Sequence, residues 1–181
     1  MRVITGSARG RKLLAPDGMK VRPTSEMAKE AIFSILHFEV EQAFVLDLFA
    51  GSGQLGIEAL SRGARFCVFV DQLRESQEVV RQNLQSTGLA ANARVAAMDS
   101  LAFLSTTNDR FDIALLDPPY EQGLIERALP LLVPKMTEGG IIVCETAKNE
   151  TLPEQVEDYK QYREYRYGKI KITTYRREEE K

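Results

Sequence analysis

From residue 44 onward, short apolar stretches alternate with stretches that have the spacing of amphipathic helices. The apolar stretches at 44–49, 66–70, 94–98, 111–116 and 141–144 each have the length of one buried strand. Between them, helical spacing is found at 55–62, 73–86, 100–105 and 124–133. Nearly continuous apolar strands that alternate with helices are typical of a parallel sheet covered on both faces. The sequence therefore predicts an α/β fold of the doubly wound type.

The two ends of the chain depart from this alternation. A basic segment that contains several glycines precedes a helix expected over 24–37, with Thr24 as its N-cap and an apolar stripe along one side. At the other end, Lys160–Tyr167 and Lys169–Arg176 flank Gly168 and have the composition of strands around a tight turn. We expect an antiparallel hairpin there, added to the parallel sheet.

A glycine-rich loop follows the first predicted strand. Gly51, Gly53 and Gly56 satisfy the pattern G-x-G-x-x-G between that strand and the next helix. Without side chains the backbone turns sharply and approaches a ligand closely, while the helix N-terminus presents free N–H groups. The motif fits either a dinucleotide or S-adenosylmethionine, and by itself it does not separate them.

Acidic residues stand in or after three of the predicted strands. Asp71 follows the second strand and is suited to accept hydrogen bonds from a ribose diol, which either cofactor carries. Asp99, followed by Ser100, is suited to receive the adenine amino group; the alternative for Asp71 and Asp99 is to cap the next helix. Asp47 lies within the first strand, where an unpartnered charge is costly, so we expect it to serve the glycine loop or the cofactor's amino group.

The tetrapeptide Asp117-Pro118-Pro119-Tyr120 ends the fourth strand and is the most informative motif. The prolines remove N–H donors and keep the backbone extended. The Asp117 carboxylate and the Pro118 carbonyl are then suited to accept one N–H each from a planar amino group, which aims the nitrogen lone pair at an electrophile. Tyr120 offers a ring on which a base could stack. Asp-Pro-Pro also occurs in ordinary loops, but that interpretation leaves the preceding glycine loop and acids unexplained.

Together these motifs favour methyl transfer over hydride transfer. A dinucleotide dehydrogenase has no evident use for the tetrapeptide, and the lone His37 falls on the N-terminal helix, far from any strand end. We therefore predict S-adenosylmethionine as cofactor, with no metal required. The expected catalytic residues are Asp117, Pro118, Pro119 and Tyr120. The expected cofactor-binding residues are Asp47, Phe49, Ala50, Gly51, Ser52, Gly53, Asp71, Asp99 and Ser100.

Charge and composition give expectations for the binding partner and the cellular compartment. The net charge is −2, yet residues 1–22 hold six basic residues against one acid, and 159–177 hold seven against one. Such basic ends fit either a polyanion-binding surface or an ordinary solvated surface. Cys67 and Cys144 both lie in apolar stretches, which predicts buried thiols in a reduced, cytoplasmic setting. No apolar run is long enough to suggest a membrane span.

Several segments resemble one family of enzymes. The segments are Asp47–Gly53, Asp117–Tyr120, Arg2–Gly6, Gly10–Leu13, Val21–Thr24, Lys29–Phe33 and Gly56–Ala64. The first two resemble class I amino-methyltransferases, and the others are similar to the RsmD-type 16S ribosomal RNA guanine-N2 methyltransferases. The resemblance covers nearly the whole chain. Two positions depart from the family pattern, Lys29 in place of arginine and Gln54 in place of a small residue.

The resemblance implies a seven-stranded, mostly parallel sheet with a reversed last strand. It also implies a single methyltransferase domain over 1–181, with a catalytic core over 41–181 and an RNA- and cofactor-facing extension over 1–40. The implied acceptor is the N2 amine of a guanine in 16S ribosomal RNA or the small ribosomal subunit. We expect the protein to act as a monomer and to have no membrane partner. The expected RNA-binding residues are Arg2, Arg9, Arg11, Lys12 and Arg22.

Three alternatives stay open at this point. A DNA adenine-N6 methyltransferase would use similar chemistry at Asp117–Tyr120, although no target-recognition domain is evident. A protein-amide methyltransferase would be expected to carry asparagine at the position of Asp117. A non-catalytic ribosome-assembly protein that binds RNA is the third, and an intact glycine loop and tetrapeptide argue against it.

Overall fold

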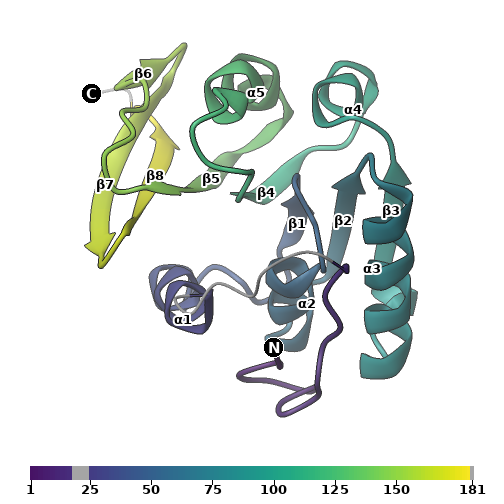
Figure 1. The fold of residues 1–181 in the computed structure, drawn as a ribbon. Helices are drawn as coiled ribbons and strands as arrows, with labels where there is room; N and C mark the ends of the chain where they lie inside the picture. Colours follow the sequence, from purple (N-terminus) through teal and green to yellow (C-terminus); the bar gives the residue numbers. More distant parts are fainter. Residues whose placement is uncertain (18–24, 180–181) are drawn as a thin grey trace.

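The computed structural model describes residues 1–17 and 25–179. Its centre is an eight-stranded sheet in the order β3-β2-β1-β4-β5-β8-β7-β6 (Figure 1). The strands are β1 (Phe44–Asp47), β2 (Phe66–Asp71), β3 (Ala93–Ala97), β4 (Phe111–Leu116), β5 (Met136–Ala147), β6 (Gln155–Val156), β7 (Tyr159–Tyr167) and β8 (Ile170–Arg177). In this order each of the strands β3, β2, β1, β4 and β5 is parallel to its neighbour. Strand β8 is antiparallel to both β5 and β7.

The predicted fold class, a mostly parallel sheet with an antiparallel C-terminal hairpin, is confirmed. The sheet has one strand more than expected, because the two-residue β6 pairs with β7 at the edge. Strand β5 is also longer than the predicted 141–144. Its first half contains Gly139 and Gly140, which hide the apolar pattern, and the β4–β5 pairing shifts register between Phe111 and Ile113.

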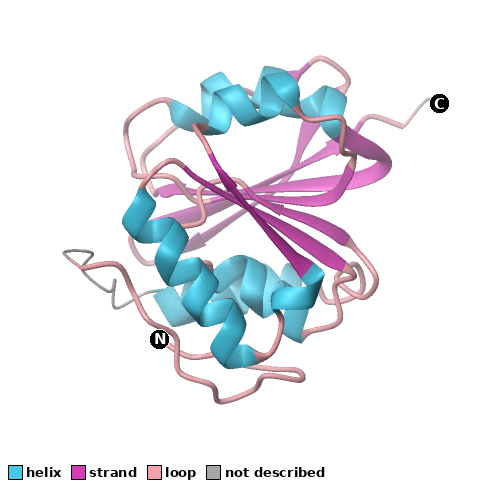
Figure 2. Cartoon of the chain, turned by 90° about the vertical axis from the view of Figure 1, so that its right-hand side faces the viewer, coloured by secondary structure: helices cyan, strands magenta, loops and turns pink. Residues whose placement is uncertain are grey.

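Helices cover both faces of the sheet (Figure 2). They are α1 (Ser25–Ile35), α2 (Gln54–Ser61), α3 (Arg74–Thr87), α4 (Ser100–Thr106) and α5 (Leu124–Leu132), with short 3₁₀ turns at Ala90–Asn92 and Val133–Lys135. Side chains of α1, α2 and α3 share one buried cluster, and those of α4 and α5 share the cluster on the other face. Thr24, the predicted cap of α1, lies outside the described residues. His37 is exposed in the turn that follows α1.

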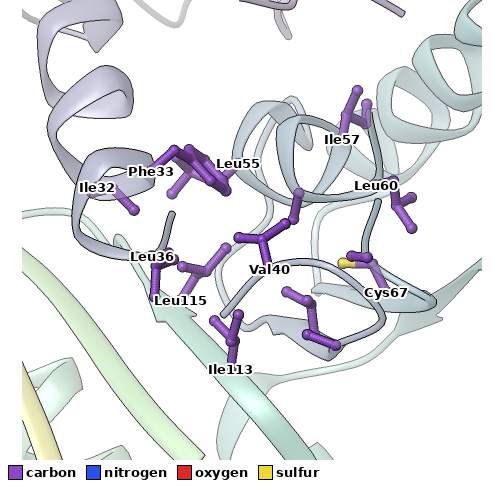
Figure 3. Close-up of a cluster of buried hydrophobic side chains, with 14 of the residues drawn as sticks. Ile32, Phe33, Leu36, Val40, Leu55, Ile57, Leu60, Cys67, Ile113 and Leu115 are labelled. Atoms are coloured by element: carbon purple, nitrogen blue, oxygen red, sulfur yellow. The ribbon is translucent and has the colours of Figure 1, made fainter. Parts of the chain in front are cut away.

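The apolar stripe predicted for α1 packs against α2. Figure 3 shows Phe33 beside Leu55 of α2 and Leu36 beside Leu115 of β4, and Ile32 belongs to the same cluster. Burial of such side chains stabilises a fold by roughly 1.5–3 kcal/mol each. Cys67 lies in the same cluster and Cys144 in the other, both as free buried thiols. Within residues 1–17 and 25–179, no helix has the length and apolarity that crossing a bilayer requires.

The N-terminal segment folds back on itself and docks on α2. Arg2 and Lys12 form an antiparallel bridge. The fully buried Glu58 of α2 accepts hydrogen bonds from the backbone N–H groups of Ile4 (2.8 Å) and Thr5 (3.0 Å). Around the same carboxylate, Arg62 Nε lies 2.9 Å and Lys29 Nζ 3.8 Å away. Glu58 therefore helps to anchor residues 1–13 on α2.

Candidate active site

Two loops that carry the predicted site residues begin side by side. In the parallel pair β1–β4, Asp47 is in register with Leu115. The N–H of Leu48 donates to the carbonyl of Leu115 at 3.1 Å, just beyond the end of β1. The glycine loop after β1 and the tetrapeptide after β4 therefore leave the same edge of the sheet from adjacent strands. In open α/β sheets ligands bind at this carboxyl edge.

The glycine loop needs glycine at two points for different reasons. Gly53 is the N-cap of α2 and has φ 80°, a left-handed conformation that residues with side chains rarely adopt. At Gly56 a Cβ atom would lie 2.3 Å from the ring of Phe69 and 2.7 Å from Cys67 Sγ. The absent side chain lets α2 lie directly against β2, which fixes the N-terminal end of the helix at the carboxyl edge.

Asp47 lies beneath this loop and is almost fully buried. Its Oδ2 accepts the N–H of Gly56 at 3.0 Å. Burial raises the pKa of Asp47 to about 7, although the Gly56 hydrogen bond opposes the rise and the nearby Asp71 adds to it. A cationic group placed over the loop would favour the ionised form of this carboxylate.

Asp71, half-buried at the end of β2, ties the glycine loop to the start of α3. Its Oδ2 accepts the N–H of Gly51 and its Oδ1 the N–H of Leu73, both at 2.9 Å. Each carboxylate oxygen has two lone pairs, so these bonds leave acceptor capacity for a ribose diol. Leu73 itself is 62% exposed beside this carboxylate and offers an apolar face for a purine ring.

Asp99 caps the next helix, which was the alternative to binding the cofactor's adenine. It is exposed at the N-cap of α4, and its Oδ2 accepts the N–H groups of Leu101 and Ala102, each at 3.1 Å. Ser100 is buried in the first turn of that helix. In the glycine loop, Ala50 and Ser52 are buried and Phe49 is half-buried. Any contact of these residues with a cofactor stays a prediction.

The tetrapeptide is held by two carboxylates of the neighbouring β5 region. Tyr120 Oη donates to Glu145 Oε1 at 2.8 Å. One residue further, the N–H of Glu121 donates to Glu150 Oε1 at 2.9 Å, and Glu150 Oε2 accepts the N–H of Ala147 at 2.7 Å. Pro118 is buried, while Asp117 and Tyr120 are half-buried. The segment is thus fixed at both its aromatic side chain and its exit.

Sequence reasoning missed these two glutamates, as well as Asn83 of α3. Glu145 had the same signal as Asp47, an acid within a buried apolar strand. Asn83 carried no such signal. Its Nδ2 donates to the carbonyls of Ser52 and Leu14, both at 2.9 Å, and its Oδ1 accepts the N–H of Leu14 at 2.8 Å. It therefore connects the N-terminal segment to the glycine loop.

The predicted RNA-binding residues lie on the docked N-terminal segment. Arg2, Arg9, Arg11 and Lys12 are all exposed, and none of the four forms an ion pair with another described residue. Arg22, the fifth, lies outside the described residues. Among residues 1–17 and 25–179, no three His, Cys, Asp or Glu side chains lie close enough together to hold a metal ion.

Comparison with known proteins gives one consistent family. The family model described as "Conserved hypothetical protein 95" matches residues 1–176. Ribosomal RNA small subunit methyltransferase D of Escherichia coli K12 is 34% identical over 180 residues, covering 98% of this chain and 90% of the relative.

Solved structures agree with this fold and family. The yhhF protein of Escherichia coli superimposes with a TM-score of 0.88 at 34% identity, covering 98% of each chain. A more distant neighbour is the 16S rRNA N2 methyltransferase RsmC of T. thermophilus, solved with AdoMet and guanosine. It has a TM-score of 0.72 at 22% identity, over 91% of this chain and 45% of that one, and shares the fold. The chain belongs to the RsmD family of methyltransferases.

Proposed function

We propose that this protein transfers a methyl group from S-adenosylmethionine to the exocyclic N2 amine of a guanine in small-subunit ribosomal RNA. The observation that carries the proposal is the adjacency of the glycine loop and the tetrapeptide at the ends of β1 and β4. A methyl donor bound at one loop and an amine bound at the other would meet without either crossing the sheet. Family membership supports ribosomal RNA as the acceptor.

The residues of the glycine loop fit this cofactor. The Asp71 carboxylate has acceptor capacity for ribose hydroxyls, and the exposed Leu73 lies where an adenine ring would need an apolar surface. Gln54 Oε1 is buried at the start of α2 and has no hydrogen-bond partner among the described residues, so a ligand with N–H donors would satisfy it. Asp47, beneath the loop, favours a ligand that carries positive charge.

In this mechanism the bound cofactor supplies an electrophilic methyl group on a positively charged sulfur. The chain's own part is to orient the acceptor. Asp117 and the carbonyl of Pro118 accept the two N–H groups of the guanine amine, which reduces delocalisation of the lone pair into the ring. The nitrogen forms its bond to the methyl carbon as the carbon–sulfur bond breaks, and the amine then releases one proton to Asp117 or to water.

Tyr120 holds the base while this happens. Its ring provides a stacking surface, a contact worth about 1–3 kcal/mol per base, and its hydroxyl is fixed on Glu145. A guanine amine within a helix is not accessible to the cofactor, so the nucleotide has to leave its stack. The exposed basic residues of segment 1–12 are proposed to hold backbone phosphates, and this extension then faces both RNA and cofactor. The activity belongs in the cytoplasm, where ribosomes are assembled.

Replacement of Asp117 by alanine tests the proposal at its centre. We expect kcat on unmodified small-subunit ribosomal RNA to fall by about 100-fold or more, because one of the two acceptors for the amine is lost. The affinity for S-adenosylmethionine should stay within about twofold, since the glycine loop is unchanged. Substantial turnover by this variant would remove Asp117 from the mechanism.

A comparison of acceptors separates the remaining alternative enzymes. The wild-type protein should methylate small-subunit ribosomal RNA and leave adenine-containing duplex DNA unlabelled. Preferential labelling of DNA would favour the adenine-N6 reaction, and labelling of protein alone would favour an amide acceptor.

A further inference from the structure

A cluster of basic side chains lies where the β5–β6 loop meets the β7–β8 turn. We call it the hairpin pocket. It is lined by the basic residues Lys148, Arg166, Lys169 and Lys171, together with Glu150 and Gly168. All four cations come from the part of the chain after the tetrapeptide, and none belongs to the N-terminal basic segment. The pocket is therefore a second, separate concentration of positive charge.

The acids near the pocket offset only part of its positive charge, because the two carboxylates of Glu150 and Glu164 face four cations. Both carboxylate oxygens of Glu150 already accept backbone N–H groups, from Glu121 and Ala147. Glu164 pairs with Arg166 at 3.2 Å, and Lys171 Nζ lies 3.8 Å from the same carboxylate. Lys148 and Lys169 are exposed and form no ion pair with any described residue. Two unpaired ammonium groups therefore remain at the opening of the pocket.

Backbone hydrogen bonds hold these two lysines in place. The N–H of Lys148 donates to the carbonyl of Lys169 at 2.9 Å, which fixes the loop against the turn. In the floor of the pocket Lys171 Nζ donates to the carbonyl of Glu150, and Arg166 is in register with Lys171 across the hairpin. The arrangement is set by the backbone, so a bound anion would not have to order a flexible loop.

The pocket is directly connected to the catalytic tetrapeptide. Glu150, which lines the pocket, binds the N–H of Glu121, the residue after Tyr120. Its other oxygen binds Ala147, two residues after the Glu145 that holds the Tyr120 hydroxyl. A chain of nucleotides whose base enters beside Tyr120 would therefore carry its neighbouring phosphates close to Lys148 and Lys169.

We propose that the hairpin pocket binds a backbone phosphate of the substrate RNA, next to the nucleotide whose base stacks on Tyr120. The inference rests on the proposed function and adds to it a second point of attachment. Extrusion of a base from its helix loses the stacking and pairing that held it there. Phosphate contacts on both sides of the extruded nucleotide, from the N-terminal segment and from the hairpin pocket, would hold the strained backbone while the base is bound.

The test is RNA binding by the double variant Lys148→Ala/Lys169→Ala over a series of KCl concentrations. The probe is unmodified small-subunit ribosomal RNA. We expect the slope of log K against log[salt] to become shallower by about 1–2, as the loss of one or two phosphate contacts requires. Affinity at low salt should fall roughly tenfold, with a raised KM and little change in kcat or in cofactor affinity.

Two matched variants serve as controls. Lys160→Ala removes a lysine from the far end of the same hairpin, where it is paired with Glu178 at 2.6 Å, and should leave the slope near that of the wild type. Lys148→Arg/Lys169→Arg keeps both charges and should retain binding. Because both lysines are exposed and unpaired among the described residues, neither double variant should alter the melting temperature appreciably.

The outcomes separate this inference from the proposed function. If the wild type methylates ribosomal RNA and the alanine double variant binds it with unchanged slope and affinity, the hairpin pocket is not a phosphate site and the proposed function stands. If the wild type transfers no methyl group to RNA but binds it with a slope that the double variant reduces, the proposed function fails and the phosphate site remains. A wild type that binds neither this RNA nor the small ribosomal subunit overturns both.

Discussion

Asp47 is the residue whose environment most clearly affects its chemistry. Its pKa is raised from 3.8 to about 7, chiefly by burial, so folding favours the protonated form. The contribution of this group to stability is therefore complete below pH 3.8 and is lost as the pH rises towards about 7.

Asp47→Asn should remove this pH dependence. Asparagine keeps an oxygen to accept the Gly56 N–H but does not titrate. The unfolding free energy of the wild type relative to the variant should decrease from pH 4 to 7 by up to ~4 kcal/mol. Urea unfolding at several pH values measures it, and a difference that stays constant across this range would show that Asp47 titrates normally.

Tyr120 combines two functions that substitution can separate. Tyr120→Phe keeps the ring but removes the hydrogen bond to Glu145, so we expect kcat/KM to fall about tenfold, as for the loss of one charge-assisted hydrogen bond. Tyr120→Ala also removes the stacking surface and should cost about tenfold more. Equal losses in the two variants would mean that the ring contributes nothing to acceptor binding.

Individual site residues could be predicted when the features that identify them lie close together in the sequence. Asp47 and Asp117 stood out because they follow or interrupt apolar stretches within a recognisable motif. Glu150 did not, since its partner Glu121 comes from a distant segment whose proximity depends on the β4–β5 pairing. Asp99 shows the opposite case, because a short acid after a strand fits both a cap and a ligand; the structure shows the cap, and the ligand role stays a prediction.

At the scale of elements, the buried Glu58 carboxylate is one of several side chains that hold the N-terminal segment, together with Ser61 and Asn83. Glu58→Ala would remove the acceptor for Ile4 and Thr5 and leave Lys29 buried without its anionic partner. The pKa of Lys29 is already lowered by burial, and loss of Glu58 should lower it further. We expect a destabilisation of about 3–5 kcal/mol and faster tryptic cleavage at Arg9–Lys12.

The control for this variant is Glu78→Ala on α3. Glu78 pairs with Arg74 on the surface, with side chains 56% and 90% exposed, so the change should be below about 1 kcal/mol. If Glu58→Ala unfolds no more easily than this control, and its N-terminal segment resists trypsin equally, Glu58 does not help to anchor the segment.

Helices and strands could be predicted where their apolar residues follow a regular spacing along the sequence. Phe111–Leu116 was delimited at both ends by sequence alone, because a polar residue precedes it and the tetrapeptide follows. Strand β6 could not be foreseen, as Gln155–Val156 is paired only because β7 has an open edge. The docking of segment 1–13 could not be predicted either, because in the sequence Glu58 resembles an ordinary surface residue of a helix.

For the whole molecule, the order of the strands places both loops at one edge of the sheet. Alternation of strands and helices predicts that the strands are parallel, because parallel neighbours need crossover helices, but it does not give their order in the sheet. The proximity of Lys148 and Lys169 was not predictable, since it depends on how β8 pairs with β5.

Binding of the cofactor should stabilise the whole fold. A ligand at about 100 times its Kd adds about 2.7 kcal/mol, which corresponds to roughly 5–10 °C in melting temperature for a domain of this size. We expect this shift with S-adenosylmethionine and its demethylated product, and none with a nicotinamide dinucleotide. A shift with the dinucleotide alone would favour the rejected interpretation of the glycine loop.

The most direct test of the central claim is the chemical identity of the methylated product. Small-subunit ribosomal RNA that lacks the modification is incubated with the protein and labelled S-adenosylmethionine, then digested to nucleosides and separated. We expect the label to appear as N2-methylguanosine and Asp117→Ala to reduce it by about 100-fold or more. Label in any other nucleoside, or none in RNA from a protein that binds the cofactor, would contradict the proposed reaction.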